Sequence, residues 1–107
     1  MKIFEKNIGY GNPILEKSFN FGIRILKFYL IRIKEDIYLK DIYKQLLRSG
    51  TSIGANVAES QEASSKKDFI NKLTIALKEA RETEYWIKLL NGTELLTQKE
   101  FQSLLND

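Results

Sequence analysis

Apolar residues recur along most of this chain at alternating steps of three and four, the spacing that places side chains on one face of an α-helix. The pattern predicts helices at about 13–35, 37–61 and 65–91, with a short fourth helix at 97–106. Because short turns join the long segments, neighbouring helices should run antiparallel. The sequence therefore predicts an all-α fold, an antiparallel up-down four-helix bundle with a short fourth helix.

Several helix starts carry a capping signal. Asn12 followed by Pro13 is typical of an N-cap and the first helical position. Ser65 and Asp68 have the spacing of a capping box, and the segment 97–100 repeats that spacing. These signals predict where the first, third and fourth helices begin.

The first and third long helices each carry two apolar strips. One strip of each helix is predicted to face the core. In the first helix it is Leu15, Phe19, Gly22, Leu26, Tyr29 and Ile33, and in the third it is Phe69, Leu73, Ala76, Ala80, Thr83, Ile87 and Leu90. A helix in a monomeric bundle needs only one such strip, so the second strips predict contacts between subunits. The predicted oligomer contacts are Phe21, Ile25, Phe28, Ile75, Trp86 and Leu89. The residues predicted to be buried include Leu26, Ile53, Leu73 and Ala80.

The second helix ends in a half that consists almost entirely of small residues. Glycine in a helix costs roughly 1 kcal/mol relative to alanine, and close approach of another helix would offset that cost at Gly50 and Gly54. We therefore predict that other helices enclose this half. The predicted structural polar network consists of Ser52, Asn56, Glu59 and Glu84. A chemically active polar site is the less favoured alternative, because buried polar groups more often satisfy one another.

Glu84 falls inside the apolar arc of the third helix, where a carboxylate needs a partner or a raised pKa. Residues of the antiparallel second and third helices should pair roughly where their numbers sum to about 126–128. The neighbours predicted in this way are Arg48 with Glu79, Glu59 with Lys67, and Glu84 with Tyr43 and Lys44.

The composition limits the chemistry. The 107 residues predict a single domain, 1–107, with 1–11 as an N-terminal arm. The chain has no Cys and no His, which removes thiol and imidazole nucleophiles and the usual zinc ligands. A hydrolase using Glu59, Asp68 and Glu84 is the weakest alternative, since no Glu-x-x-His pair exists to build a di-iron site. We expect a non-enzymatic protein with no cofactor and no metal.

The apolar runs are too short to span a bilayer, and the first residues do not resemble a signal peptide. We therefore expect a cytoplasmic protein with no membrane association. The positive charge is uneven: residues 1–48 hold ten Lys and Arg against five Asp and Glu. This balance indicates a polyanion partner. The candidate nucleic-acid-binding residues are Lys40, Lys44 and Arg48, which form one ridge, with Lys17, Arg24 and Lys27 from the first helix. A solvated helix face is the competing interpretation.

The run LLRSGTSIGANVAESQEASSKKDFINKLTIALKEARETEYWIKLL, residues 46–90, resembles the bacterial 23S rRNA intervening-sequence protein family. The upstream EKSFNFGIRILKFY, residues 16–29, fits the first helix of the same family. The resemblance implies a four-helix bundle that assembles as a homopentamer. A relative, the diversity-generating-retroelement accessory protein, is thought to bind nucleic acid and a reverse transcriptase. Family members usually continue the fourth helix for several more turns than this chain does.

Two functions follow as hypotheses. The first is a homo-oligomer that binds RNA or DNA with weak sequence specificity, in which symmetry repeats a modest basic ridge. The second is an assembly or accessory factor that docks another protein and has no direct nucleic-acid role. Most members of the family have no established biochemical activity, so the resemblance does not choose between these hypotheses.

Overall fold

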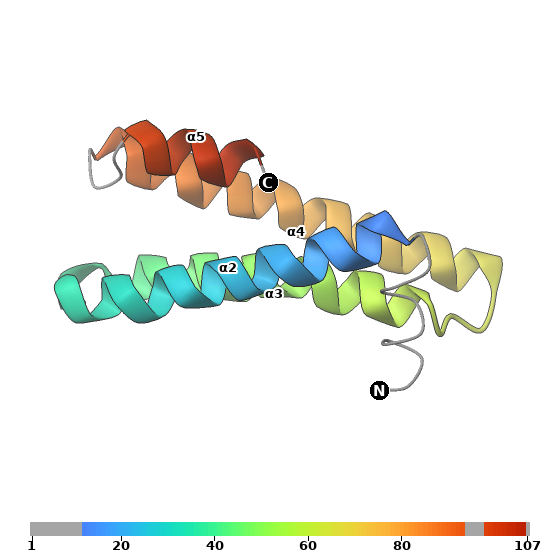
Figure 1. Cartoon of the computed structure of the whole chain (residues 1–107). Coiled ribbons are helices and arrows are strands. Elements are labelled where there is room, and N and C mark those ends of the chain that lie inside the picture. The colour runs from blue at the N-terminus through green and yellow to red at the C-terminus, as the bar shows by residue number, and fades with distance from the viewer. Residues whose placement is uncertain (1–11, 94–97, 107) are drawn as a thin grey trace.

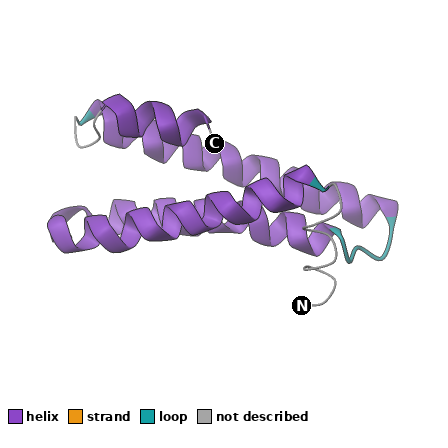
Figure 2. Ribbon diagram, in the orientation of Figure 1, coloured by secondary structure: helices purple, strands orange, loops and turns teal. Residues whose placement is uncertain are grey.

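The computed structural model describes residues 12–93 and 98–106. These residues form five helical elements, which follow one another along the chain. They are α2 (Pro13–Glu35), the 3-10 helix η1 (Ile37–Leu39), α3 (Lys40–Ser60), α4 (Lys66–Gly92) and α5 (Gln98–Asn106). No strand occurs in the described ranges (Figure 2). The all-α prediction is confirmed, while the predicted arm at 1–11 lies outside the described residues.

The helix starts follow the predicted capping chemistry. The Asn12 side chain accepts a hydrogen bond from the backbone N–H of Leu15 at 3.2 Å, ahead of Pro13 at the first helical position. The Ser65 hydroxyl accepts from the backbone N–H of Asp68 at 3.0 Å. The predicted second helix divides in two, because Asp36 caps the short η1 turn by accepting from the backbone N–H of Tyr38.

The long helices α2, α3 and α4 lie side by side in alternating directions, and α5 packs on α4 (Figure 1). Helix α5 covers only the half of the bundle nearest the α2–α3 turn (Figure 1). Two arginines of α2 bind α5. Arg24 donates to the carbonyl oxygen and hydroxyl of Ser103 at 3.1 and 2.6 Å, and Arg32 forms an ion pair with Glu100.

The core consists of two clusters along the bundle. The larger one, beneath α5, contains Ile25, Tyr43, Leu46, Ile87, Leu90 and Leu104. The smaller one contains Leu15, Val57 and Ala76, near the start of α2. Full burial of a large apolar side chain contributes about 1.5–3 kcal/mol to folding, so the clusters hold all four helices together.

The two glycines of α3 permit close approach to α2, as predicted. A Cβ atom at Gly50 would lie 3.0 Å from both Cγ atoms of Ile25. At Gly54 it would lie 3.0 Å from the backbone carbonyl oxygen of Ser18. A side chain at Gly50 would therefore require Ile25 to shift, and one at Gly54 would require the backbone of α2 to shift.

The assignment of the two apolar strips of α2 was only partly correct: Leu15 of the predicted core strip is buried, but over the middle of the helix the other strip faces the core. Ile25, predicted at a subunit contact, is fully buried at 0% exposure. Phe21 and Phe28 pack against the same core cluster. Leu26, predicted to be buried, is exposed. The reason lies in α3: the space left by Gly50 accepts the branched side chain of Ile25, which turns the opposite strip outward.

The predicted core face of α4 is largely correct. Ala76, Thr83, Ile87 and Leu90 are buried. Three residues predicted to be buried are only half-buried, because α5 ends before it reaches them: Leu73 and Ala80 of α4, and Ile53 of α3. In the second strip, Trp86 packs partly against the core, Ile75 is half-buried, and Leu89 is exposed.

Candidate functional site

The small-residue half of α3 is enclosed on one side only. Ser49, Gly50 and Val57 are buried against α2 and α4, whereas Thr51 and Ala55 are exposed. The interior polar contact of this region joins Ser49 to Thr83, whose hydroxyl oxygens lie 2.9 Å apart. This pair was not predicted from the sequence, although the hydroxyl of Thr83 in an otherwise apolar seam was a usable signal.

The four residues of the predicted polar network do not share a partner. Ser52 donates to the carbonyl oxygen of Arg48 at 2.6 Å, and Asn56 donates to that of Ser52 at 2.8 Å. Glu59 pairs with Lys72 at 2.8 Å, one turn beyond the predicted Lys67. Intrahelical bonds and surface ion pairs satisfy these groups locally, so the four residues do not form one network.

The expectation of a buried Glu84 was wrong. Its side chain is 55% exposed and pairs with Lys88 on the same helix at 2.7 Å, not with Tyr43 or Lys44. The hydrogen bond from Lys88 lowers the pKa of Glu84. Glu84 lies at the edge of the apolar arc, where α5 does not cover it and its carboxylate remains exposed to water.

Arg48 contacts two carboxylates of α4. Its guanidinium lies 3.2 Å from Glu79, which confirms the predicted pair, and it also pairs with Glu82. The hydrogen bond with Glu82 raises the pKa of Arg48 and lowers the pKa of Glu82. Arg48 is therefore already neutralised within the chain.

The six candidate basic residues fall into separate groups. Arg24 is bonded to Ser103 of α5, and Lys17 lies on the α5 side of α2. Lys40 and Lys44 lie one turn apart on the exposed side of α3, where no carboxylate of the described chain forms an ion pair with them. Lys27 is likewise exposed and unpaired within the described ranges. The basic ridge is thus reduced to Lys40 and Lys44, with Lys27 on the neighbouring helix.

An exposed apolar stripe runs along α2. We call Phe19, Ile23, Leu26 and Leu30 the α2 stripe; their exposed fractions are 43%, 39%, 44% and 51%. The steps of four, three and four are those of a helix that packs against another helix. Beside the stripe, the exposed small residues Thr51 and Ala55 of α3 leave room for close approach. Such a continuous apolar surface is typical of a protein–protein contact.

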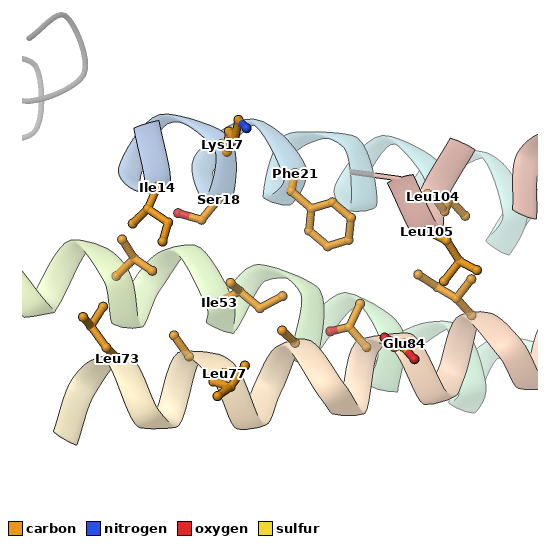
Figure 3. A pocket seen from close by; sticks show the side chains of 15 residues that line it. Ile14, Lys17, Ser18, Phe21, Ile53, Leu73, Leu77, Glu84, Leu104 and Leu105 are labelled. Carbon is orange, nitrogen blue, oxygen red and sulfur yellow. The ribbon is translucent and has the colours of Figure 1, made fainter. Parts of the chain in front are cut away.

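A groove lies where the fourth helix position is empty, on the opposite side of α2 from the stripe. It has a volume of about 470 Å³, and Leu104 and Leu105 of α5 close one end (Figure 3). We call it the α2–α4 groove. Its lining includes Ile14, Ser18 and Phe21 of α2, Ile53 and Val57 of α3, and Leu73, Leu77 and Ala80 of α4.

Within 12–93 and 98–106, no group of three or more Asp and Glu side chains is placed to hold a metal ion. In the same ranges, no helix has the length and apolar character needed to cross a bilayer.

The described residues form an all-α bundle of three long helices and one short helix. The model of one family, the 23S rRNA-intervening sequence protein, matches residues 12–107. The chain belongs to this family. No curated protein matches the chain.

A solved structure is similar to this chain over most of its length. It is described as a protein with unknown function from the S23 ribosomal protein family of Bacteroides thetaiotaomicron. The sequences are 49% identical and the structures superpose with a TM-score of 0.84. The similarity covers 89% of this chain and 84% of that one.

Proposed function

We propose that this chain is a non-enzymatic, cytoplasmic homo-oligomer that binds RNA or DNA with weak sequence specificity. The observation that carries the proposal is the exposed α2 stripe with Lys40, Lys44 and Lys27 near it. Burial of the stripe between copies would repeat these cations around an assembly. The family resemblance suggests a homopentamer, and the family name, which refers to 23S rRNA, favours RNA as the ligand.

Repetition matters because two or three lysines bind phosphate weakly on their own. Each neutralised phosphate releases counterions, so the logarithm of affinity falls with the logarithm of salt concentration, with a slope proportional to the number of phosphates contacted. Linked sites add their contributions through effective concentration. Lysines on a helical surface contact phosphates and carry no direct base readout, so affinity should vary little with sequence.

A filter-binding titration tests the nucleic-acid part. The probes are a structured RNA hairpin and a duplex DNA of equal length, titrated across a salt series. We expect binding at low salt that weakens steeply toward physiological salt. The variant Lys40→Glu/Lys44→Glu should lose about tenfold or more in affinity at low salt. The matched control Lys66→Glu/Lys67→Glu makes the same charge change at the start of α4 and should retain binding.

The competing function is a protein-docking accessory factor without a nucleic-acid role. The apolar surface of the described chain favours it, since many leucine and isoleucine side chains are exposed and exposed apolar patches are typical of protein contacts. Wild-type protein that fails to bind either probe at low salt, while remaining oligomeric, would leave this second function in place of the first.

A further inference from the structure

Three carboxylates lie in the middle of α4, and all three are engaged within the chain. Glu79 and Glu82 both bind Arg48 of α3, which holds them toward that helix with side chains 17% and 35% exposed. Glu84 lies on the outer side of α4, where it pairs with Lys88 at 2.7 Å. The outer side of the middle of α4 therefore keeps no unpaired carboxylate within the described ranges.

Two cations on this outer side have no carboxylate of their own. Lys78 and Arg81 are exposed and form no ion pair within the described parts of the chain. Tyr85 follows Arg81 by four residues and is 58% exposed. The steps of three and four place these side chains on one face of the helix, over about 10 Å. We call Lys78, Arg81 and Tyr85 the α4 face.

The ring of Tyr85 is held in position by a neighbour. Its centroid lies 5.1 Å from that of Trp86, and the two ring planes meet at 74°. Trp86 in turn packs against the larger core cluster. A ring that is already held loses less conformational freedom when a ligand binds to it. Exposed aromatic rings beside cations are typical of proteins that bind single-stranded nucleic acid, because bases stack on the rings while the cations contact phosphates.

The overall charge of this part of the sequence conceals the α4 face. Residues 49–107 hold seven Lys and Arg against nine Asp and Glu. This balance gave no reason to expect a polyanion on α4. The ion pairs of Arg48 and Lys88 decide the outcome, because they engage the carboxylates nearest to Lys78 and Arg81.

We propose that the α4 face binds single-stranded nucleic acid, with Lys78 and Arg81 on the phosphates and Tyr85 stacked on a base. This inference rests on the proposed function and adds to it a site and a class of ligand. A duplex keeps the faces of its bases inside its own stack, so it would gain the phosphate contacts without the stacking. The contribution of Tyr85 should therefore be present with a single strand and absent with a duplex.

Fluorescence anisotropy with the full chain at low salt tests the proposal. The probes are a labelled oligouridylate and a labelled duplex RNA of equal length. Tyr85→Ala should lower the affinity for the oligouridylate about fivefold or more and leave the affinity for the duplex unchanged. Tyr85→Phe keeps the ring and should bind both probes as wild type does. Lys78→Glu/Arg81→Glu should weaken the binding of both probes, because it removes phosphate contacts.

Tyr38→Ala is the matched control. Tyr38 is 96% exposed, but Asp36 accepts a hydrogen bond from its backbone N–H, and Asp41 follows three residues later. These carboxylates oppose the approach of a phosphate, so Tyr38→Ala should bind both probes as wild type does.

The outcomes separate this inference from the proposed function. Unchanged affinity of Tyr85→Ala for the oligouridylate, or an equal loss on both probes, would overturn the stacking role. If Lys78→Glu/Arg81→Glu keeps its affinity while Lys40→Glu/Lys44→Glu loses it, the α4 face is not a binding site and the proposed function stands. Absence of binding by wild type would overturn both. A lower mass of Tyr85→Ala by light scattering would assign the ring to a contact between copies and also overturn the inference.

Discussion

The hydroxyl oxygens of Ser49 and Thr83 lie 2.9 Å apart in the interior between α3 and α4. Thr83 Oγ1 also lies 2.8 Å from the carbonyl oxygen of Glu79. Because each hydroxyl carries one proton, both contacts are satisfied when Ser49 donates to Thr83 and Thr83 donates to Glu79. The pair places a directional bond where the rest of the seam is apolar, and so fixes the register of α4 on α3.

This contact predicts a non-additive pair of substitutions. Thr83→Val keeps the shape but leaves the Ser49 hydroxyl with only a long contact to the carbonyl oxygen of Leu46, and should cost about 1–3 kcal/mol. Ser49→Ala/Thr83→Val removes both polar groups and should cost less than the sum of the single variants. Urea unfolding of the four proteins gives the coupling energy. Strict additivity would show that the two hydroxyls do not interact.

The sequence predicted those parts of the fold that depend on local chemistry or on one unambiguous apolar face. The caps at Asn12 and Ser65 and the core face of α4 are of this kind. The pairing rule placed Arg48 beside Glu79 correctly, because adjacent antiparallel helices keep a constant offset. About three turns farther along α3, the same rule gave Lys67 for Glu59 where Lys72 is the partner, since a long lysine side chain reaches across a turn.

The orientation of α2 could not be predicted in the same way. Both of its strips are apolar, so periodicity alone does not decide which one faces the core. The decision comes from α3, where Gly50 leaves the space that Ile25 occupies. The docking of α5 was also hidden, because Arg24 and Arg32 appear in the sequence as ordinary solvated cations. Their hydrogen bonds to Ser103 and Glu100 depend on a helix that lies about seventy residues away in the chain.

The glycines of α3 predict a graded response to alanine. Alanine gains up to about 1 kcal/mol of helix propensity, but overpacking costs about 1–3 kcal/mol. Gly54→Ala should destabilise more than Gly50→Ala, because the atom it meets is backbone at Ser18 and not the side chain of Ile25. Gly92→Ala is the control, since nothing lies within 4 Å of its Cβ position, and it should be neutral or stabilising. Thermal unfolding of the three variants ranks them, and a stabilised Gly54→Ala would refute the close approach.

The ion pair between Arg48 and Glu82 predicts a pH dependence. Arg48 lowers the pKa of Glu82 below its ordinary value, so the contribution to stability is present above that value and disappears as the pH falls through the folded-state pKa. Glu82→Gln should therefore be less stable than wild type at neutral pH. The difference should stay below about 1 kcal/mol, because the pair is largely exposed and Glu79 continues to hold Arg48.

The same experiment at low pH provides the check. When Glu82 is protonated in both states of the wild type, the two proteins should unfold at nearly the same urea concentration. Glu62→Gln, at an exposed carboxylate with no partner in the described ranges, should match wild type throughout. A constant difference across the pH range would assign the effect to packing of the side chain and not to its charge.

The exposed stripe of α2 predicts the site of self-assembly. Ile23→Glu/Leu30→Glu should reduce the mass measured by light scattering at micromolar concentration, because two carboxylates cannot be buried between apolar helices without a large desolvation cost. Leu89→Glu tests the exposed member of the other predicted contact strip on α4. Leu77→Glu, in the groove, is the control and should keep the wild-type mass. Wild-type protein that is already monomeric would remove the stripe from consideration as a self-association surface.

A variant of Arg24 tests whether this cation holds α5 in place or contacts nucleic acid. Its guanidinium donates to the carbonyl oxygen and hydroxyl of Ser103, and so holds α5 on α2. A nine-residue helix is marginal on its own and depends on such docking. Arg24→Gln should therefore increase amide hydrogen exchange in α5 while the long helices keep their protection. Affinity for RNA or DNA should stay unchanged, in contrast to the loss expected for Lys40→Glu/Lys44→Glu. Exchange that remains slow in α5, together with weakened nucleic-acid binding, would instead place Arg24 among the phosphate-contacting residues.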